Sequence, residues 1–372
     1  MRYYLIAGEA SGDLHGSNLI KSLKAEDPEA EFRFWGGDLM RSACGGQNPV
    51  ADYRESAVMG YSDVLKKAAR LSRKLKFCRE DIIAWKPDLV IPIDYPGFNM
   101  RIAKSCHEAG LRVFYYIAPK TWASRDWRNR QLKAYADKLF IIFPFEAQYF
   151  AGKGIPFVYK GNPLTDEIEA HSFVRPCAER YIAVLPGSRA GEIRRTLPAC
   201  MEAAGKFGLK VLIAGAPSSQ ESDYLPFIKG RENVELLFGR TYDILKFADA
   251  AVINSGTASL EAAIIGTPQL VCWSTSRFNF FIFKYFLRVD KKINFISLGN
   301  LCLQRSAFKE LVQDEFTAEA VAEELGRLLD DRDYRDSMMA DYASVREMLG
   351  GGGVSRAIAR SMIEELKTFN TI

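Results

Sequence analysis

Residues 2–16 read RYYLIAGEASGDLHG, an apolar run that passes into a glycine-rich turn and then into a helical pattern. A strand that feeds a turn and a helix in this way is the building unit of a parallel α/β sheet. The same alternation continues along the chain and starts again after about residue 180. We therefore expect two doubly wound parallel-sheet domains. The expected strands are 2–7, 88–93, 112–117, 138–143 and 156–159 in the first set, and 181–185, 210–214, 234–237, 250–253 and 269–272 in the second.

The segment Gly161–Arg175 combines glycine, proline and a charge cluster, and we take it as the join between the domains. The expected domains are therefore residues 1–165 and 166–349. Four consecutive glycines follow at 350–353 and must interrupt a helix, because each glycine costs about 1 kcal/mol relative to alanine. The remaining segment, 350–372, is expected to form a last helix, with the N-terminal domain as its candidate partner.

The composition limits the class of protein. The 372 residues are 48% hydrophobic and 26% charged, which excludes a disordered or fibrous chain. The net charge of +4 is unevenly divided, since residues 1–165 carry +7 and the remainder −3. A basic half indicates an anionic partner. Seven scattered cysteines without a C-x-x-C pair suit a reducing compartment. No signal peptide and no uncharged apolar stretch of about 18 residues is recognisable, so we expect a cytoplasmic protein that can still lie on a membrane surface.

Motifs for common cofactors are absent from the sequence. It contains neither a P-loop nor a G-x-G-x-x-G dinucleotide fingerprint. The three histidines, His15, His107 and His171, lack the spacing of metal ligands. We expect no metal and no cofactor. Nucleic acid is not an expected partner either, because no binding module is recognisable.

Ligands of parallel α/β sheets bind beyond the carboxyl ends of the strands. The first such end holds Gly8, Ser11, Gly12 and Asp13, with Ser11 and Asp13 expected to cap the helix that follows. A well-capped turn explains these residues but leaves Glu9 unexplained. A carboxylate at this edge is a candidate acid or base.

A second carboxylate follows the apolar run Leu89–Ile93. Asp94 closes this expected strand, where partial burial would suit it to accept a proton from a hydroxyl group. An ordinary turn or helix-capping aspartate is the alternative interpretation.

Two further strand ends combine features that bind anions. After strand 181–185, Gly187, Ser188 and Arg189 place backbone N–H groups and a guanidinium at a helix start, with Glu192 in the first turn. After strand 250–253, a helix N-terminus carries hydroxyl groups and, one turn deeper, a carboxylate that suits a ribose. These residues are Ser255, Gly256, Thr257 and Glu261. Two cradles in one domain indicate a nucleoside diphosphate, although a surface arginine and an exposed helix glutamate remain the simpler alternatives.

These motifs resemble the lipid-A-disaccharide synthase family of bacterial glycosyltransferases. The matching segments span nearly the whole chain and keep the family's order. They are AGEASGDLHGS (7–17), KPDLVIPIDYPGFN (86–99), YYIAPKTWASR (115–125), GNPLTDEI (161–168), LPGSRAGEI (185–193), NSGTASLEAAIIGTPQLV (254–271) and ISLGNLCLQRSAFKELVQ (296–313).

The resemblance implies a GT-B fold, in which two Rossmann-like domains enclose the active site in a cleft. The implied reaction joins UDP-2,3-diacylglucosamine to 2,3-diacylglucosamine 1-phosphate (lipid X), with inversion, in lipid A biosynthesis. The products are a β-1,6-linked disaccharide 1-phosphate and UDP. Some family members form intertwined dimers, so a homodimer is an option for this chain.

The resemblance also assigns roles to residues. Arg189 and the Ser255–Thr257 turn would hold the diphosphate, Glu261 the ribose, and Asp94 or Glu9 would be the base. Asn300, Glu310 and Gln313 match the family's C-terminal signature on the donor side. Many family members carry aspartate where this chain has Gly97, so a base role of that aspartate would pass to Asp94 or Glu9 here.

Membrane and acceptor contacts are expected on the basic half. Residues 64–79 read VLKKAARLSRKLKFCR, with seven basic residues, no acidic residue and apolar residues at helical spacing. Such a helix can lie on an anionic bilayer, here the cytoplasmic face of the inner membrane, or can be an ordinary helix with a solvated side. The candidate residues on this side are Lys66, Lys67, Arg70, Arg73, Lys74, Lys76, Trp122, Arg125 and Arg128. An aromatic and basic stretch at 273–295 is expected to form an acyl groove, a membrane patch, a dimer contact or a core helix.

Two alternative functions remain open at this point. One is another GT-B enzyme acting on a UDP-sugar, such as an N-acetylglucosaminyltransferase or a UDP-sugar 2-epimerase. The other is a regulator that binds a UDP-sugar or a lipid without catalysis.

Overall fold

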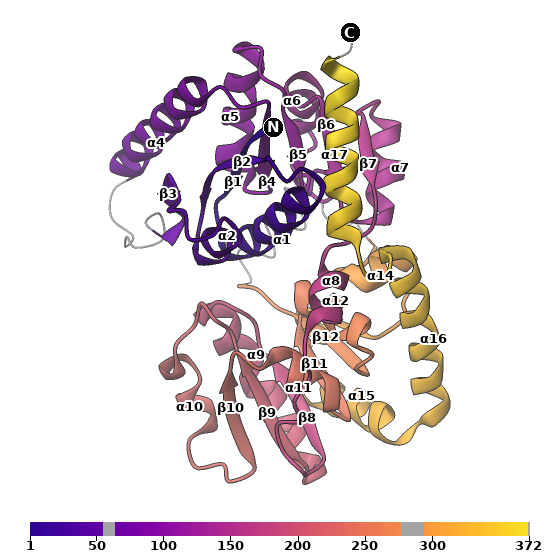
Figure 1. Ribbon diagram of the computed structural model, residues 1–372. Helices are drawn as coiled ribbons and strands as arrows, with labels where there is room; N and C mark the ends of the chain where they lie inside the picture. Colours follow the sequence, from indigo (N-terminus) through magenta and orange to yellow (C-terminus); the bar gives the residue numbers. More distant parts are fainter. Residues whose placement is uncertain (55–63, 277–293, 371–372) are drawn as a thin grey trace. The chain divides into compact units, whose positions relative to one another are not determined.

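The computed structural model describes residues 1–54, 64–276 and 294–370. The chain divides into two compact units (Figure 1). The first comprises residues 1–166 together with the C-terminal segment from Leu349, and the second comprises Glu167–Met348. The first division point lies inside the segment Gly161–Arg175.

The first unit is built on a seven-stranded parallel sheet with the order β3-β2-β1-β4-β5-β6-β7. Its strands are β1 (Arg2–Ala7), β2 (Glu31–Gly36), β3 (Ala51–Asp52), β4 (Leu89–Ile93), β5 (Phe114–Tyr116), β6 (Lys138–Ile141) and β7 (Phe157–Tyr159). The strand order reverses between β1 and β4, which pair with Ala7 opposite Ile93. The turns that carry Glu9 and Asp94 therefore leave the sheet side by side, at the point where doubly wound sheets bind ligands.

Helices cover the sheet because its central strands are apolar on both faces, and β4 is buried along its whole length. The helices of the first unit are α1 (Ala10–Glu26), α2 (Asp38–Ala43), α4 (Val64–Trp85), α5 (Pro96–Glu108), α6 (Arg128–Tyr135), α7 (Pro144–Gly152) and α17 (Val354–Asn370). Helix α8 (Leu164–Ala170) contains the division between the units.

Helix α17 closes the first unit, although it comes from the far end of the sequence (Figure 1). The Asp166 carboxylate accepts hydrogen bonds from the N–H groups of Gly353, Val354 and Ser355 at 2.6–3.0 Å and so caps the start of this helix. Arg360 and Arg356 bond to Glu26 on α1, and the Lys138 ammonium lies 2.9 Å from Glu365.

The second unit holds a six-stranded parallel sheet with the order β10-β9-β8-β11-β12-β13. Its strands are β8 (Tyr181–Leu185), β9 (Lys210–Gly215), β10 (Val234–Phe238), β11 (Ala250–Asn254), β12 (Gln269–Trp273) and β13 (Glu310–Val312). Its helices are α9 (Ala190–Ala204), α10 (Leu225–Ile228), α11 (Thr241–Phe247), α12 (Thr257–Ile265), α14 (Leu298–Leu303), α15 (Ala318–Asp330) and α16 (Arg332–Leu349). The order reverses between β8 and β11, the two strands that precede the expected anion cradles.

Candidate active site

The β4 end of the first unit has an unusual backbone. Asp94 and Tyr95 both adopt left-handed conformations, with φ of 42° and 46°. The turn brings the Tyr95 ring against Gly8, where a Cβ atom would lie 2.2 Å from a ring carbon. Only glycine fits at position 8 for this reason. Strained backbone of this kind costs roughly 1–3 kcal/mol per residue and is concentrated at functional sites.

Two buried polar groups hold this turn. The Asn99 side-chain amide, with 0% exposure, donates to the carbonyl oxygens of Ile6, Ile93 and Asp94 at 2.8–3.2 Å. The Tyr115 hydroxyl donates to the Asp94 carbonyl at 2.7 Å. Asn99 thereby connects the ends of β1 and β4 and holds the backbone of Asp94.

The Asp94 carboxylate is half-buried, and its surroundings adjust its acidity. Burial and the nearby charge of Glu9 raise the pKa of Asp94 to about 6, against the opposing charge of Lys120. Glu9 itself is exposed. A carboxylate with this pKa is mostly ionised at neutral pH and is still basic enough to take a proton from a hydroxyl group.

Basic residues follow the neighbouring strand β5. Arg125 has a φ of 58°, and the Arg128 guanidinium lies 5.6 Å from the centre of the Trp127 ring. Burial and the positive charge of Arg125 lower the pKa of Arg128. The charge of Arg128 acts on Tyr115, whose hydroxyl bonds to Asp94. Positive charge therefore lies beside Asp94 at this edge of the sheet, from Lys120, Arg125 and Arg128.

Trp122 was expected on the acceptor side, and its indole N–H instead donates to Glu146 at 3.1 Å. Glu146 is 1% exposed and also accepts from the N–H groups of Ile142 and Phe143. Burial raises the pKa of Glu146 to about 7. This buried glutamate was not predicted from the sequence, since nothing in PFEAQ marks it apart from its place after an apolar strand.

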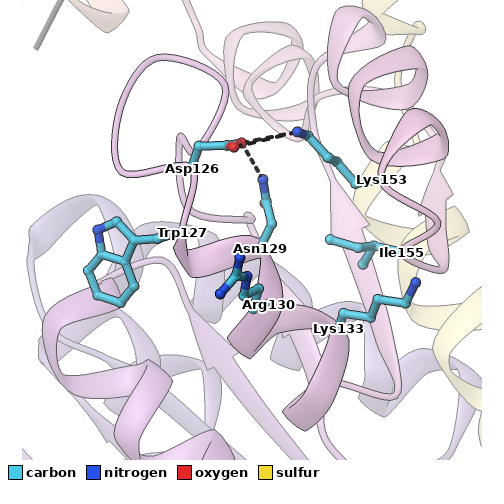
Figure 2. Close-up of a pocket in the computed structure, with 7 residues that line it drawn as sticks. All are labelled: Asp126, Trp127, Asn129, Arg130, Lys133, Lys153 and Ile155. Atoms are coloured by element: carbon cyan, nitrogen blue, oxygen red, sulfur yellow. Dashed lines mark hydrogen bonds and ion pairs between the residues drawn. The ribbon is translucent and has the colours of Figure 1, made fainter.

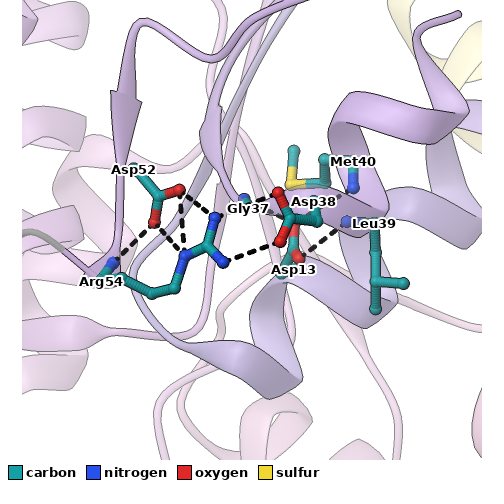
Figure 3. A network of polar contacts seen from close by, with 7 residues as sticks. All are labelled: Asp13, Gly37, Asp38, Leu39, Met40, Asp52 and Arg54. Atoms are coloured by element: carbon teal, nitrogen blue, oxygen red, sulfur yellow. Dashed lines mark hydrogen bonds and ion pairs between the residues drawn. The ribbon is translucent and has the colours of Figure 1, made fainter. Parts of the chain in front are cut away.

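The expectation for Ser11, Gly12 and Asp13 was wrong. They lie inside α1, which begins at Ala10, and neither Ser11 nor Asp13 caps this helix. The buried Asp13 carboxylate instead accepts from the N–H groups of Gly37, Leu39 and Met40 at 2.7–3.1 Å (Figure 3). It thus holds the start of α2. The neighbouring Arg54 bridges Asp38 and Asp52 at the surface.

In the second unit, the structure brings the two expected cradles together. Gly187 has a φ of 110°, and a Cβ atom there would lie 2.7 Å from the Asn254 amide nitrogen and 2.7 Å from the Glu192 carboxylate. The ends of strands β8 and β11 are therefore in close contact at Gly187. Glu192 accepts from the Ser188 N–H at 3.0 Å and from Arg189 at 2.7 Å. The expected anion donors of this loop are thus held by the protein's own carboxylate, with the Arg189 side chain 80% exposed.

The second cradle is the start of α12. Thr257 is the first residue of the helix and is exposed, and no side chain caps this end. The Ser255 hydroxyl donates to the Ile296 carbonyl at 3.1 Å. Glu261 is half-buried and lies beside Tyr242. Burial and the charge of Glu167 raise the pKa of Glu261 to about 7. Glu167 and Tyr242, which sequence reasoning missed, thus surround the expected ribose ligand.

Asn300, Glu310 and Gln313 are hydrogen-bonded within the protein. The Asn300 amide, 0% exposed, bonds to the Phe308 carbonyl, the Ala307 N–H and Glu310 at 2.8–3.0 Å. The Glu310 carboxylate also accepts from the N–H groups of Ile296 and Ser297. Gln313 makes two bonds, both of 3.0 Å, to the backbone of Thr275. These side chains hold the loops beside the α12 end, and their role on the donor side stays a prediction.

The basic segment expected at 64–79 lies in helix α4. Arg73 and Lys76 are exposed, whereas Arg70 and Lys74 are half-buried and make contacts within the protein. The side chains of Lys66 and Lys67 lie outside the described part of the structure, as do residues 277–293 of the aromatic stretch expected at 273–295. Phe77, the residue after Lys76 on α4, is 51% exposed.

Comparison with known proteins decides the family. A model of the lipid-A-disaccharide synthetase family matches residues 3–357. The chain is 36% identical over 380 residues to the lipid-A-disaccharide synthase of Geobacter metallireducens, covering 98% of this chain and 97% of that one. The corresponding Myxococcus xanthus enzyme is 35% identical, with coverage of 98% and 97%. The chain belongs to the lipid-A-disaccharide synthase family.

Solved structures show that this family member has the GT-B fold. UDP-N-acetylglucosamine 2-epimerase from Neisseria meningitidis, bound to UDP-N-acetylglucosamine, superposes with a TM-score of 0.70 at 13% identity, covering 98% of this chain and all of that chain. The calicheamicin glycosyltransferase CalG4 gives 0.60 at 15% identity, with 98% coverage of both chains. Identities this low carry information about the fold alone.

Two features are absent from the described residues, a metal-binding cluster and a membrane-spanning helix. No three His, Cys, Asp or Glu side chains among residues 1–54, 64–276 and 294–370 gather as a metal site would require. Within the same residues, no helix is both long and apolar enough to cross a membrane.

Proposed function

We propose that this synthase family member transfers 2,3-diacylglucosamine from its UDP conjugate to 2,3-diacylglucosamine 1-phosphate. The 6-hydroxyl oxygen of the acceptor attacks the anomeric carbon, and the bond from that carbon to the diphosphate oxygen breaks. UDP leaves with the bonding electron pair, and a β-1,6-linked disaccharide 1-phosphate forms. The observation that carries this proposal is Asp94, a half-buried carboxylate at the β1/β4 reversal whose pKa of about 6 suits a general base.

Asp94 takes the proton of the attacking hydroxyl in this proposal. Its support is geometric, because Asn99 and Tyr115 hold the Asp94 backbone in the strained turn. Glu9 acts on Asp94 through its charge, which keeps the pKa of Asp94 higher than it would otherwise be. The sequence left Asp94 and Glu9 as equal candidates, and the burial of Asp94 favours it.

The second unit binds the UDP part. The exposed Arg189 guanidinium and the uncapped start of α12 supply positive charge for the diphosphate, and Glu261 accepts the ribose hydroxyls. Charge on the departing diphosphate is then stabilised by the protein, so the proposal includes no metal ion and no cofactor. Arg189 must leave Glu192 to reach a ligand, and Glu192 keeps the guanidinium beside the site until then.

The first unit binds the acceptor. Lys120, Arg125 and Arg128 lie on the Asp94 side of the sheet edge, where their charges suit the 1-phosphate of the acceptor. Both substrates are lipids, so we place the protein on the cytoplasmic face of the inner membrane. Exposed Arg73, Lys76 and Phe77 on α4 support a contact with an anionic bilayer. A homodimer is compatible with the family and remains part of the proposal.

Donor selectivity tests the function. Purified protein in detergent should release UDP when it receives UDP-2,3-diacylglucosamine and lipid X together. It should leave non-acylated UDP-N-acetylglucosamine unchanged. Epimerisation or transfer of the non-acylated sugar would favour the other GT-B activities, and substrate binding without turnover would favour a regulator.

A further inference from the structure

A pocket lined by charged and apolar groups on the first unit lies outside the proposed active site. It has a volume of about 490 Å³ and is formed by the start and one side of α6 together with the chain that follows α7 (Figure 2). The residues that line it are Asp126, Trp127, Asn129, Arg130, Lys133, Lys153 and Ile155. Three of these seven side chains are cations and one is an anion.

The single carboxylate in the pocket is already engaged. Asp126 lies 3.4 Å from the Lys153 ammonium and accepts from Asn129 at 2.7 Å and from the Tyr149 hydroxyl at 2.6 Å. Arg130 and Lys133 have no carboxylate within ion-pair distance among the described residues. Both side chains are exposed at the pocket.

Two segments of the chain place cations around the pocket, since α6 carries Arg130 and Lys133 and the chain after α7 carries Lys153. The Lys133 ammonium lies 3.3 Å from the position that a Cβ atom on Gly154 would take, and Gly154 directly follows Lys153 in the chain. Arg130 is three residues before Lys133 on α6 and lies on the same side of the helix. Unbalanced positive charge around a concave surface attracts an anion.

The floor of the pocket consists of buried side chains, one of which is hydrogen-bonded within the protein. Asn129 is 7% exposed, and its amide oxygen accepts from the Thr121 hydroxyl at 2.8 Å. Ile155 is 3% exposed and supplies an apolar wall. A helix that was merely solvated would need neither this buried polar network nor a concave arrangement of its charges.

The rim of the pocket carries Trp127, which is 59% exposed. An exposed indole beside clustered lysine and arginine is typical of a surface that enters the headgroup layer of a bilayer. A pocket for a soluble anion would not need such a side chain at its edge. The positive charge of the pocket and the exposed Trp127 indole together favour a lipid headgroup over a free anion as the ligand.

We propose that the α6 pocket binds the phosphate of an anionic membrane lipid headgroup, with Arg130 and Lys133 as its donors and Trp127 inserted beside it. This proposal depends on the proposed function in one respect, because lipid substrates are what bring the protein to a bilayer. Together with the exposed face of α4, the pocket gives the first unit a second point of attachment, which fixes how this unit is oriented on the membrane.

The test is binding of the full chain to vesicles, with the double variant Arg130→Ala/Lys133→Ala. Binding to phosphatidylglycerol vesicles should weaken on the order of 30-fold, since each basic residue near an anionic surface contributes roughly fivefold. Wild-type binding to phosphatidylcholine vesicles should be weak. Turnover in detergent should remain at the wild-type level, so a failure of this proposal is distinguishable from a failure of the proposed function.

Controls separate the pocket from general charge effects. Lys206→Ala/Arg332→Ala removes two exposed cations from the second unit and should leave vesicle binding unchanged. Trp127→Phe should abolish a blue shift of tryptophan fluorescence on vesicle binding. Wild-type-like binding of the pocket variant, or absent binding by the wild type, would overturn the proposal. If millimolar inorganic phosphate displaced the protein from phosphatidylglycerol vesicles, the assignment to a lipid would be overturned. The pocket would then be a site for free phosphate.

Discussion

Single residues decide the chemistry at the β4 end. Asp94 gains its basicity from burial and from Glu9, and loses part of it to Lys120. Its position depends on Asn99, whose side-chain amide donates to three backbone carbonyl oxygens at the ends of β1 and β4 and in the strained turn. The properties of one carboxylate are therefore set by neighbours from several elements.

Asp94→Asn should lower kcat by about 10²–10⁴-fold while UDP affinity stays unchanged, because the variant lacks the base but keeps the nucleotide site. Steady-state rates and calorimetric UDP titration measure the two effects. Wild-type turnover by Asp94→Asn would show that another group removes the proton.

The pH dependence of kcat/KM tests the charged neighbours of Asp94, because each neighbour is expected to shift it in a known direction. Protonation removes the base, so kcat/KM of the wild type should fall as the pH decreases through about 6. Glu9→Gln removes the charge that raises the pKa of Asp94, so the acid limb should move to lower pH. Lys120→Ala removes the opposing charge and should move it to higher pH. Shifts in the same direction for both variants would contradict the assignment to Asp94.

Arg189→Ala should reduce kcat/KM by at least about 10²-fold, the scale expected when a charge partner of the transition state is lost. Arg194, exposed on the same helix α9, provides the matched control, and Arg194→Ala should behave like the wild type. Near-normal turnover of Arg189→Ala would remove this residue from the mechanism.

Motifs at strand ends could be recognised from the sequence, but the partners of each side chain could not. Gly187 and Ser255 lie where their spacing after apolar strands indicated. Asn300 and Glu310 were interpreted as donor contacts, whereas their hydrogen bonds lie within the protein. Such bonds join residues 8 and 10 positions apart, so the short helical and strand spacings that a sequence pattern reports contain no signal for them.

At the scale of elements, the α1/α2 connection depends on one buried carboxylate. Asp13→Ala would leave three N–H groups of the α2 start without an acceptor, and should lower the unfolding free energy by roughly 2–4 kcal/mol. Chemical denaturation measures this change. Asp38→Ala removes one carboxylate from an exposed ion pair with Arg54. It should change the free energy of unfolding by less than about 1 kcal/mol. Equal effects of the two variants would contradict the structure.

The apolar central strands were predictable as elements, since β4 and β8 are continuous buried runs. Strands β2, β3 and β13 were missed. Strand β2 reads EFRFWG, and its Arg33 is compatible with a sheet only because Asp81 of α4 accepts from its guanidinium at 2.8 Å. Strand β3 has two residues, and β13 has three with a charged first residue. Tertiary contacts decide such elements.

At the scale of the whole molecule, the first unit requires both ends of the chain. Ile358, Met362 and Leu366 of α17 are at most 1% exposed and lie on one face of the helix. Burial of each such side chain contributes about 1.5–3 kcal/mol, and a domain is stable by only about 5–15 kcal/mol.

A chain that ends after Leu349 should therefore fail to fold its first unit, while the second unit keeps its own core. Differential scanning calorimetry should lose the transition of the first unit, and limited proteolysis should leave a fragment from about residue 167 onwards. An unchanged melting curve would show that α17 is dispensable. Arg356→Ala, a loss of one exposed ion-pair partner, should change stability by less than about 1 kcal/mol.

The uneven charge of the chain agrees with separate tasks for the two units. The basic excess belongs to the unit that holds the proposed base Asp94 together with α4 and the α6 pocket, and we assign the last two to lipid contacts. In the proposed function, the other unit binds the nucleotide through one arginine and a helix start, so it needs no general basicity.

Identification of the product tests the proposed reaction most directly. Purified protein should convert UDP-2,3-diacylglucosamine and lipid X into equal amounts of UDP and a tetraacyl disaccharide 1-phosphate. Mass spectrometry should give the mass of the joined sugars, and NMR should show a β-1,6 linkage. Absence of a disaccharide, with both substrates present and the protein folded, would contradict the proposed function.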